Sequence, residues 1–209
     1  MSEEQDQEQE PKKKAKREYK ADTPMTKLLQ RHVPKNVEAF GKLLTMSGVK
    51  PKAIYEGFGG LGHQTKWLVD NLSSDCKKHL VWDTDEECCE ILKAKFPNIE
   101  VFQADFFEQH IDPPQDSLVC VDYNNFTMNP TNIKRLAPIF NTGYRWLIGP
   151  DLARGKLHLN WERTYHIEEC DYDVYIKEFS KRTKEQFGMK IKGYVKAPRS
   201  ITYVLWEKV

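Results

Sequence analysis

The glycine-rich segment from Tyr55 to Gly62 has the composition of a ligand-binding turn. Four of its eight residues are glycines, which leave the main chain open to close approach and adopt dihedral angles that other residues avoid. Glu56 adds a carboxylate, which we expect to face a positively charged ligand. The segment therefore predicts a site where a ligand lies directly against the backbone.

Two further acidic residues follow at spacings that suit a nucleoside. Asp83 comes about 20 residues after the last glycine, where a carboxylate can accept hydrogen bonds from both ribose hydroxyls. Asp85 is assigned instead to capping the next helix. Asp105 could accept a hydrogen bond from an adenine amino group, and Phe106 could pack on the adenine ring. These residues predict a ligand that contains adenosine.

Other interpretations of the glycines remain open at this point. Gly57, Gly59 and Gly62 also match the G-x-G-x-x-G spacing of dinucleotide-binding turns, and a tight turn that binds nothing needs the same residues. A pyrophosphate would be repelled by a carboxylate in the turn. Glu56 and Asp105 therefore favour a sulfonium nucleoside with a free amino group over a dinucleotide.

Strand-like and helix-like patterns alternate along most of the chain. This order predicts an α/β fold with a parallel sheet that is wound on both faces. Two strand-like runs at the end are separated by only four residues and should form an antiparallel hairpin. We therefore expect a seven-stranded, mostly parallel, doubly wound sheet with a C-terminal antiparallel hairpin. The predicted strands are 53–55, 80–82, 100–102, 117–121, 146–148, 190–196 and 201–206, and the predicted helices are 64–71, 86–95, 132–140 and 174–187.

The N-terminal segment differs from the rest. Residues 1–22 are nearly devoid of apolar side chains and include a basic cluster from Lys12 to Lys20, so we expect a disordered charged tail. The tail either improves solubility or acts as an arm that grips phosphates. Residues 23–209 are expected to form a single domain with N-terminal helices over 26–48, which Pro34 divides in two.

Bulk composition excludes several classes of protein. The chain has 32 Lys and Arg against 31 Asp and Glu, so its net charge of +1 gives no overall attraction to nucleic acid or membrane. The five cysteines form no Cys-x-x-Cys pair, and no metal site is expected. No apolar run approaches the roughly 20 residues of a membrane span. The odd cysteine count and the lack of a signal peptide favour the cytoplasm, or the nucleus in a eukaryotic or viral setting.

The glycine turn resembles the first motif of class I S-adenosylmethionine-dependent methyltransferases. The nearest variant is that of nucleic-acid methyltransferases, an acidic residue followed by Pro-Phe-x-Gly-x-Gly, here with Gly57 in place of the proline. The order of elements over residues 36–209 is also similar to that family. The resemblance implies S-adenosylmethionine as the cofactor and nucleic acid as the substrate. The cofactor-binding residues that it implies are Glu56, Gly57, Phe58, Gly59, Gly60, Gly62, Asp83, Asp105, Phe106 and Asp122.

The fourth motif of that family begins with Asp or Asn, followed by two prolines and an aromatic residue that stacks on a flipped base. Asp122 matches the first position, Tyr123 and Asn124 replace the prolines, and Asn125 replaces the aromatic, with Phe126 one place late. The resemblance implies that Asp122 takes a proton or orients the acceptor, helped by Asn124 and Asn125. The alternatives are that Asp122 only caps a loop, and that the protein is a non-catalytic member of the fold that binds nucleic acid or a protein partner.

Two basic groups could contact substrate phosphates. One follows the predicted strand 146–148 and contains Arg154, Lys156 and His158, although an ordinary solvated loop has the same composition. The other lies on the predicted helix 174–187, with Lys177, Lys181, Arg182 and Lys184 interleaved with acidic residues. The second group fits an ion-paired solvent face first and a phosphate-tracking face second.

Overall fold

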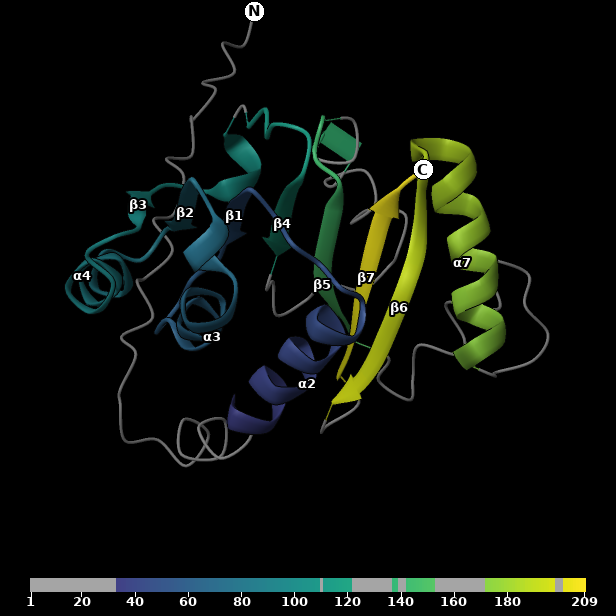
Figure 1. Ribbon diagram of the computed structural model, residues 1–209, viewed down its shortest axis with the longest axis horizontal. Coiled ribbons are helices and arrows are strands. Elements are labelled where there is room, and N and C mark those ends of the chain that lie inside the picture. Colours follow the sequence, from purple (N-terminus) through teal and green to yellow (C-terminus); the bar gives the residue numbers. More distant parts are fainter. Residues whose placement is uncertain (1–32, 110, 122–136, 139–141, 153–171, 198–200) are drawn as a thin grey trace, which may run out of the picture.

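The structure is a computed structural model in which seven strands of the described residues form one sheet, in the order β3-β2-β1-β4-β5-β7-β6 (Figure 1). This order confirms the predicted α/β fold. The strands are β1 (Ala53–Gly57), β2 (Lys78–Asp83), β3 (Glu100–Gln103), β4 (Ser117–Val121), β5 (Trp146–Leu152), β6 (Met189–Ala197) and β7 (Ile201–Lys208). The helices are α2 (Val33–Met46), α3 (His63–Asn71), α4 (Glu86–Lys95) and α7 (Tyr172–Phe187), with short 3-10 helices η1 (Ser73–Asp75) and η2 (Phe106–Glu108). The structure describes residues 33–109, 111–121, 137–138, 142–152, 172–197 and 201–209.

Strands β1 to β5 pair in parallel, whereas β7 runs antiparallel to both β5 and β6. Every residue of β1 and of β4 is buried, as expected for central parallel strands that are covered on both faces. The C-terminal hairpin closes with Ala197 opposite Ile201, which confirms the predicted pairing.

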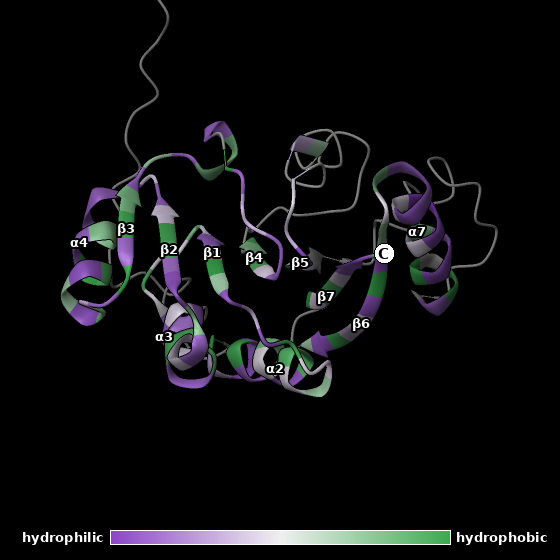
Figure 2. Cartoon of the chain, turned by 45° about the horizontal axis from the view of Figure 1, so that its top comes forward, coloured by the Kyte–Doolittle hydropathy of each residue, from purple (hydrophilic) through white to green (hydrophobic). Residues whose placement is uncertain are grey.

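The helices lie on the two faces of the sheet (Figure 2). Helices α2 and α3 cover one face, where Phe40 and Leu68 pack with Ile54 of β1. Helix α7 covers the β6 end of the other face through Ile176 and Phe179. Because side chains alternate along a strand, neighbouring residues of β1 enter opposite cores, and this alternation decides where each candidate site residue points.

Strand β5 is longer than predicted. It continues through Pro150 to Leu152, so the start of the predicted loop after residue 148 is part of the sheet. The reason is that β4 pairs with β5 only as far as Ile148, whereas β7 continues to pair with it up to Leu152. The basic residues of that loop lie outside the described residues.

The N-terminal prediction is tested only in its second half. Helix α2 begins at Val33 and contains Pro34 in its first turn, where the missing N–H has no intrahelical partner to lose. Pro34 is therefore a helix-start residue in the described part of the chain. The tail over residues 1–22, the start of the first predicted helix and most of the predicted helix 132–140 lie outside the described residues.

Candidate cofactor site

The glycine turn lies at the carboxyl edge of the parallel strands. Strand β1 ends at Gly57, and the N–H groups of Phe58 and Gly59 donate to the Trp82 carbonyl of neighbouring β2 at 2.7 and 3.3 Å. The turn then passes into α3, which begins at His63. In open α/β sheets this edge is where ligands bind.

The glycines of the turn are needed for different reasons. A Cβ atom at Gly57 would lie 2.6 Å from the Phe106 ring, one at Gly59 would lie 2.5 Å from Val81, and one at Gly62 would lie 2.8 Å from Phe96. These three glycines are thus fixed by packing within the protein.

Gly60 differs from the other glycines of the turn. It has a φ of +51°, and a Cβ atom there would meet only the Phe58 carbonyl oxygen, 4.0 Å away. Gly60 is therefore the position at which a ligand could approach the bare backbone.

Asp83 ends β2 beside this opening. Its carboxylate accepts hydrogen bonds from the N–H of Gly60 at 2.8 Å through one oxygen and from the N–H of Asp85 at 2.9 Å through the other. Each carboxylate oxygen can accept a second hydrogen bond, and the side chain is partly exposed. Asp83 is thus held in place by the glycine turn while it keeps acceptor capacity for a ligand.

Asp85 caps the following helix, as the sequence predicted. Its side chain accepts a hydrogen bond from the N–H of Cys88 at 3.0 Å at the start of α4. The two neighbouring carboxylates therefore differ in position. Asp83 borders the turn, and Asp85 completes a helix.

Glu56 does not face the open edge. Its carboxylate is 2% exposed and accepts a hydrogen bond from Thr65 of α3 at 2.9 Å, and it lies 3.2 Å from His79 of β2. The cause is strand alternation, because Glu56 points to the α3 face whereas Tyr55 and Gly57 point to the other. The expectation that this carboxylate faces a cationic ligand is therefore corrected, since it lies beneath the turn.

Asp105 and Phe106 differ in exposure, so only Asp105 is accessible to a ligand. The Asp105 side chain is partly exposed and accepts a hydrogen bond from the N–H of Phe107 at 2.9 Å, which leaves its second oxygen available. Phe106 is only 1% exposed and fills the space beside Gly57. The expectation that Phe106 packs on an adenine ring is thus corrected, because both faces of this ring are enclosed by the core.

Phe58 occupies an unusual backbone conformation for its type. Its φ is +66°, a region where a residue with a side chain is strained, and its ring centroid lies 5.3 Å from that of Phe107. Both rings are partly buried at the edge where β1 and β3 end. Phe58 and Phe107 are therefore two partly buried aromatic rings at this edge of the described structure, and sequence reasoning had not assigned Phe107.

Two more residues border the turn that sequence reasoning missed. The ammonium of Lys95, at the end of α4, donates to the Leu61 carbonyl at 3.3 Å. Burial, and then the charge of Lys95, lower the pKa of His63 at the start of α3. His63 could have been noted as the first residue after the turn, but no local signal connects Lys95 with a segment more than 30 residues earlier.

The predicted catalytic residues Asp122, Asn124 and Asn125 lie outside the described residues. Strand β4 ends at Val121, which pairs in register with Gly57, so the last residue described before Asp122 lies next to the start of the glycine turn. Among the residues that are described, no group of three or more His, Cys, Asp or Glu side chains could hold a metal ion. None of the helices described is long and apolar enough to cross a membrane.

Comparison of the structure with solved structures identifies the class of the fold, whereas comparison of the sequence does not. No protein-family model matches this chain, and no curated protein matches its sequence. The structure resembles magnesium protoporphyrin IX methyltransferase from Synechocystis PCC 6803 with bound SAH, with a TM-score of 0.60 and 11% identity over 90% of this chain and 88% of that one.

Two other methyltransferases are similar. A SAM-dependent methyltransferase from Aquifex aeolicus has a TM-score of 0.57 and 14% identity over 90% of this chain and all of that one. The 23S rRNA methyltransferase ErmE has a TM-score of 0.54 and 13% identity over 82% and 68% of the two chains. The chain thus has the class I S-adenosylmethionine-dependent methyltransferase fold.

Proposed function

We propose that this protein binds S-adenosylmethionine at the glycine turn and transfers its methyl group to an acceptor. The observation that carries this proposal is the opening at Gly60, where the backbone is bare and the Asp83 carboxylate lies within a hydrogen bond of it. Asp83 would hold the ribose hydroxyls, and Asp105 with the rings of Phe58 and Phe107 would hold the adenine. When bound, the cofactor supplies a methyl group on a cationic sulfonium.

A dinucleotide fits this chain less well, although Glu56 no longer provides the reason. Its carboxylate lies beside His79 inside the protein, so it would not repel a pyrophosphate in the turn. The argument now rests on topology. Dinucleotide-binding sheets of this type are built with a last strand parallel to the others, whereas β7 here is inserted antiparallel between β5 and β6.

We infer that nucleic acid is the substrate and that Asp122, with Asn124 and Asn125, acts on the acceptor. The support is the first-motif variant, in which Glu56 and Phe58 match the acidic and aromatic positions of nucleic-acid methyltransferases, and the rRNA named in the description of one structural neighbour. The changed fourth motif favours a second candidate, a protein of this fold that binds nucleic acid or a protein without transferring a methyl group.

Calorimetry and a transfer assay test these proposals separately. S-adenosylhomocysteine should bind with measurable heat, whereas NAD should not, and absence of heat from S-adenosylhomocysteine would rule out the cofactor assignment. Transfer of a labelled methyl group to RNA or DNA would separate the enzyme from the non-catalytic binder. Asp122→Ala should abolish transfer and leave S-adenosylhomocysteine affinity intact, and full activity of that variant would remove Asp122 from the mechanism.

A further inference from the structure

Charge is distributed very unevenly along the sheet. Residues 53–121, which form β1 to β4 with α3 and α4, carry 13 Asp and Glu against 5 Lys and Arg. The described residues of 33–52, 172–197 and 201–209, which form α2, α7, β6 and β7, carry 12 Lys and Arg against 5 Asp and Glu. In Figure 1, α7 and β6 lie at the opposite end of the sheet from β3 and α4, and α2 lies between the two ends. The net charge of +1 therefore conceals an acidic end and a basic end.

Helix α7 presents a row of lysines to solvent at the basic end. Lys177, Lys181 and Lys184 are all exposed, and their spacing of four and three residues places them along one side of the helix. The buried side is formed by Ile176 and Phe179, which pack on the sheet. At a rise of about 1.5 Å per residue, the row extends over roughly 10 Å.

The charges of these lysines are not compensated by ion pairs in the part of the chain that the structure describes. No ion pair is found for Lys177, Lys181 or Lys184 within the described residues, whereas neighbouring Arg182 pairs with Glu178 at 3.0 Å. Glu178 of α7 thus compensates Arg182 and not a lysine of the row.

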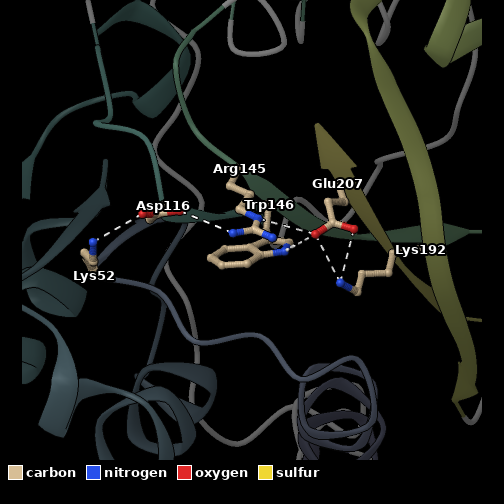
Figure 3. Close-up of polar contacts among 6 residues, drawn as sticks. All are labelled: Lys52, Asp116, Arg145, Trp146, Lys192 and Glu207. Carbon is tan, nitrogen blue, oxygen red and sulfur yellow. Dashed lines mark hydrogen bonds and ion pairs between the residues drawn. The ribbon is translucent and has the colours of Figure 1, made fainter. Parts of the chain in front are cut away.

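The lysines of strand β6 do not extend this row. Lys190 is exposed at the start of β6, but it lies between Met189 and Ile191, which pack in the core covered by α7, so its side chain is on the opposite face of the sheet. Lys192 pairs with Glu207 at 3.1 Å in a chain of contacts that also includes Arg145 (Figure 3). Both lysines are therefore excluded from the surface that we define by Lys177, Lys181 and Lys184, and that we name the α7–β6 surface because α7 packs against β6.

We propose that the α7–β6 surface binds the phosphate backbone of a single-stranded nucleic acid. A polyanion would be attracted to this end of the protein and repelled by the acidic end, so the two charges together orient it. An anionic membrane fits less well, because the apolar side of α7 is buried against the sheet and cannot enter lipid.

The surface also leads toward the candidate cofactor site. Strand β6 runs parallel to β5, because both are antiparallel to β7, and α7 ends directly before β6 begins. The start of α7 therefore lies toward the carboxyl edge that carries the glycine turn. A nucleic-acid strand bound along α7 would extend toward that edge. The role of this surface in presenting a substrate rests on the proposed function. Binding of the strand itself needs no cofactor.

Fluorescence anisotropy with labelled 20-nucleotide RNA and DNA strands tests the proposal on the full chain without cofactor. The test variant combines Lys177→Glu, Lys181→Glu and Lys184→Glu. A matched control combines Lys77→Glu, Lys78→Glu and Lys93→Glu, which makes the same charge change with exposed lysines of the acidic end. Circular dichroism melting confirms that both variants fold.

The α7 variant should bind at least tenfold more weakly than the parent, and the control should change less than threefold. The slope of log affinity against log salt should fall by about two for the α7 variant, as expected when three phosphate contacts are lost from a single strand. The RNA and DNA arms identify which polymer is preferred. Equal losses in both variants, no loss in the α7 variant, or binding to phosphatidylserine vesicles but to neither strand would overturn the proposal.

S-adenosylhomocysteine calorimetry on the same samples keeps the two proposals distinguishable. The α7 variant should bind S-adenosylhomocysteine as the parent does, because none of its three changed residues borders the glycine turn. If the parent fails to bind S-adenosylhomocysteine but loses oligonucleotide binding through these lysines, the cofactor assignment fails and the α7–β6 surface stands.

Discussion

The carboxylate of Glu56 and the imidazole of His79 meet inside the protein, 3.2 Å apart, with both side chains at most 3% exposed. Thr65 donates to the second carboxylate oxygen at 2.9 Å. On the far side of the ring, Nδ1 lies 3.1 Å from the hydroxyl of Ser73, which itself donates to the Leu68 carbonyl. The pair joins β1, β2 and α3 beneath the glycine turn.

Replacing one member of this pair should destabilise the fold. Glu56→Gln leaves His79 beside an uncharged partner in the core, and we expect a loss of about 3 kcal/mol in the free energy of unfolding. Urea denaturation measures it. Asp70→Asn is the control, because it breaks the exposed Lys66–Asp70 pair and should cost under about 0.5 kcal/mol. Equal effects of the two substitutions would show that the buried pair contributes no more than a surface one.

Substitution of Asp83 should weaken ligand binding, whereas substitution of Asp85 should lower the stability of the fold. Asp83→Ala removes the carboxylate assigned to the ribose, and we expect S-adenosylhomocysteine affinity to fall at least about tenfold, or 1.4 kcal/mol. Asp85→Ala removes the α4 cap and should lower the free energy of unfolding by about 1 kcal/mol without changing affinity by more than about twofold. Calorimetry and urea denaturation on both variants measure the two effects. The assignment of Asp83 fails if Asp83→Ala retains the parent's affinity.

Gly59 and Gly60 should also respond differently to one added methyl group. Gly59→Ala drives a Cβ atom to 2.5 Å from Val81 and 2.9 Å from Leu92, so we expect a loss of several kcal/mol and little folded protein. The Cβ atom of Gly60→Ala meets no protein atom closer than 4.0 Å. Its only cost is that alanine must adopt the left-handed backbone conformation, which destabilises the folded state by about 1–2 kcal/mol. Gly60→Ala should therefore fold but lose affinity for S-adenosylhomocysteine. A Gly60→Ala variant that binds normally would place the ligand elsewhere.

The sequence predicted those features of the site that depend on residues close together along the chain. The glycine turn between a strand and a helix located the candidate site, and the step from strand to helix distinguished Asp83 from Asp85. The hairpin was also predictable, because only four residues separate its two strand-like runs. Each of these features is set by neighbours along the chain.

Other features of the site depend on contacts between distant segments. Glu56 lies 23 residues from His79, and nothing near Glu56 in the sequence shows that it has a buried partner. Phe106 was assigned to a ligand, but the absent side chain of Gly57 opens a space in the core that this ring fills. A pattern of residue types specifies which side of a strand a side chain takes, but not which distant segment is packed there.

The amino-terminal edge of the sheet is held together by an ion-pair network around Glu207 (Figure 3). Its carboxylate contacts Lys192 at 3.1 Å, Arg145 at 3.4 Å and the indole N–H of Trp146 at 3.2 Å. Burial alone would raise the pKa of Glu207, but Lys192, Trp146 and Arg145 together hold that pKa below its ordinary value of 4.5. The carboxylate is therefore bound more favourably in the folded chain than in the unfolded one.

This lowered pKa predicts how stability should depend on pH. A carboxyl group whose pKa is lower in the folded state stabilises the protein above its unfolded pKa, and that contribution disappears as pH falls through the folded value. We expect Glu207→Gln to lower the free energy of unfolding by about 1 kcal/mol at pH 7. The difference from the parent should begin to shrink below about pH 5. Urea denaturation at several pH values measures it, with Glu178→Gln, at the partly exposed pair with Arg182, as a variant of smaller effect. A difference that stays constant down to the acid transition would show that Glu207 acts through packing, because only the charged carboxylate attracts Lys192 and Arg145.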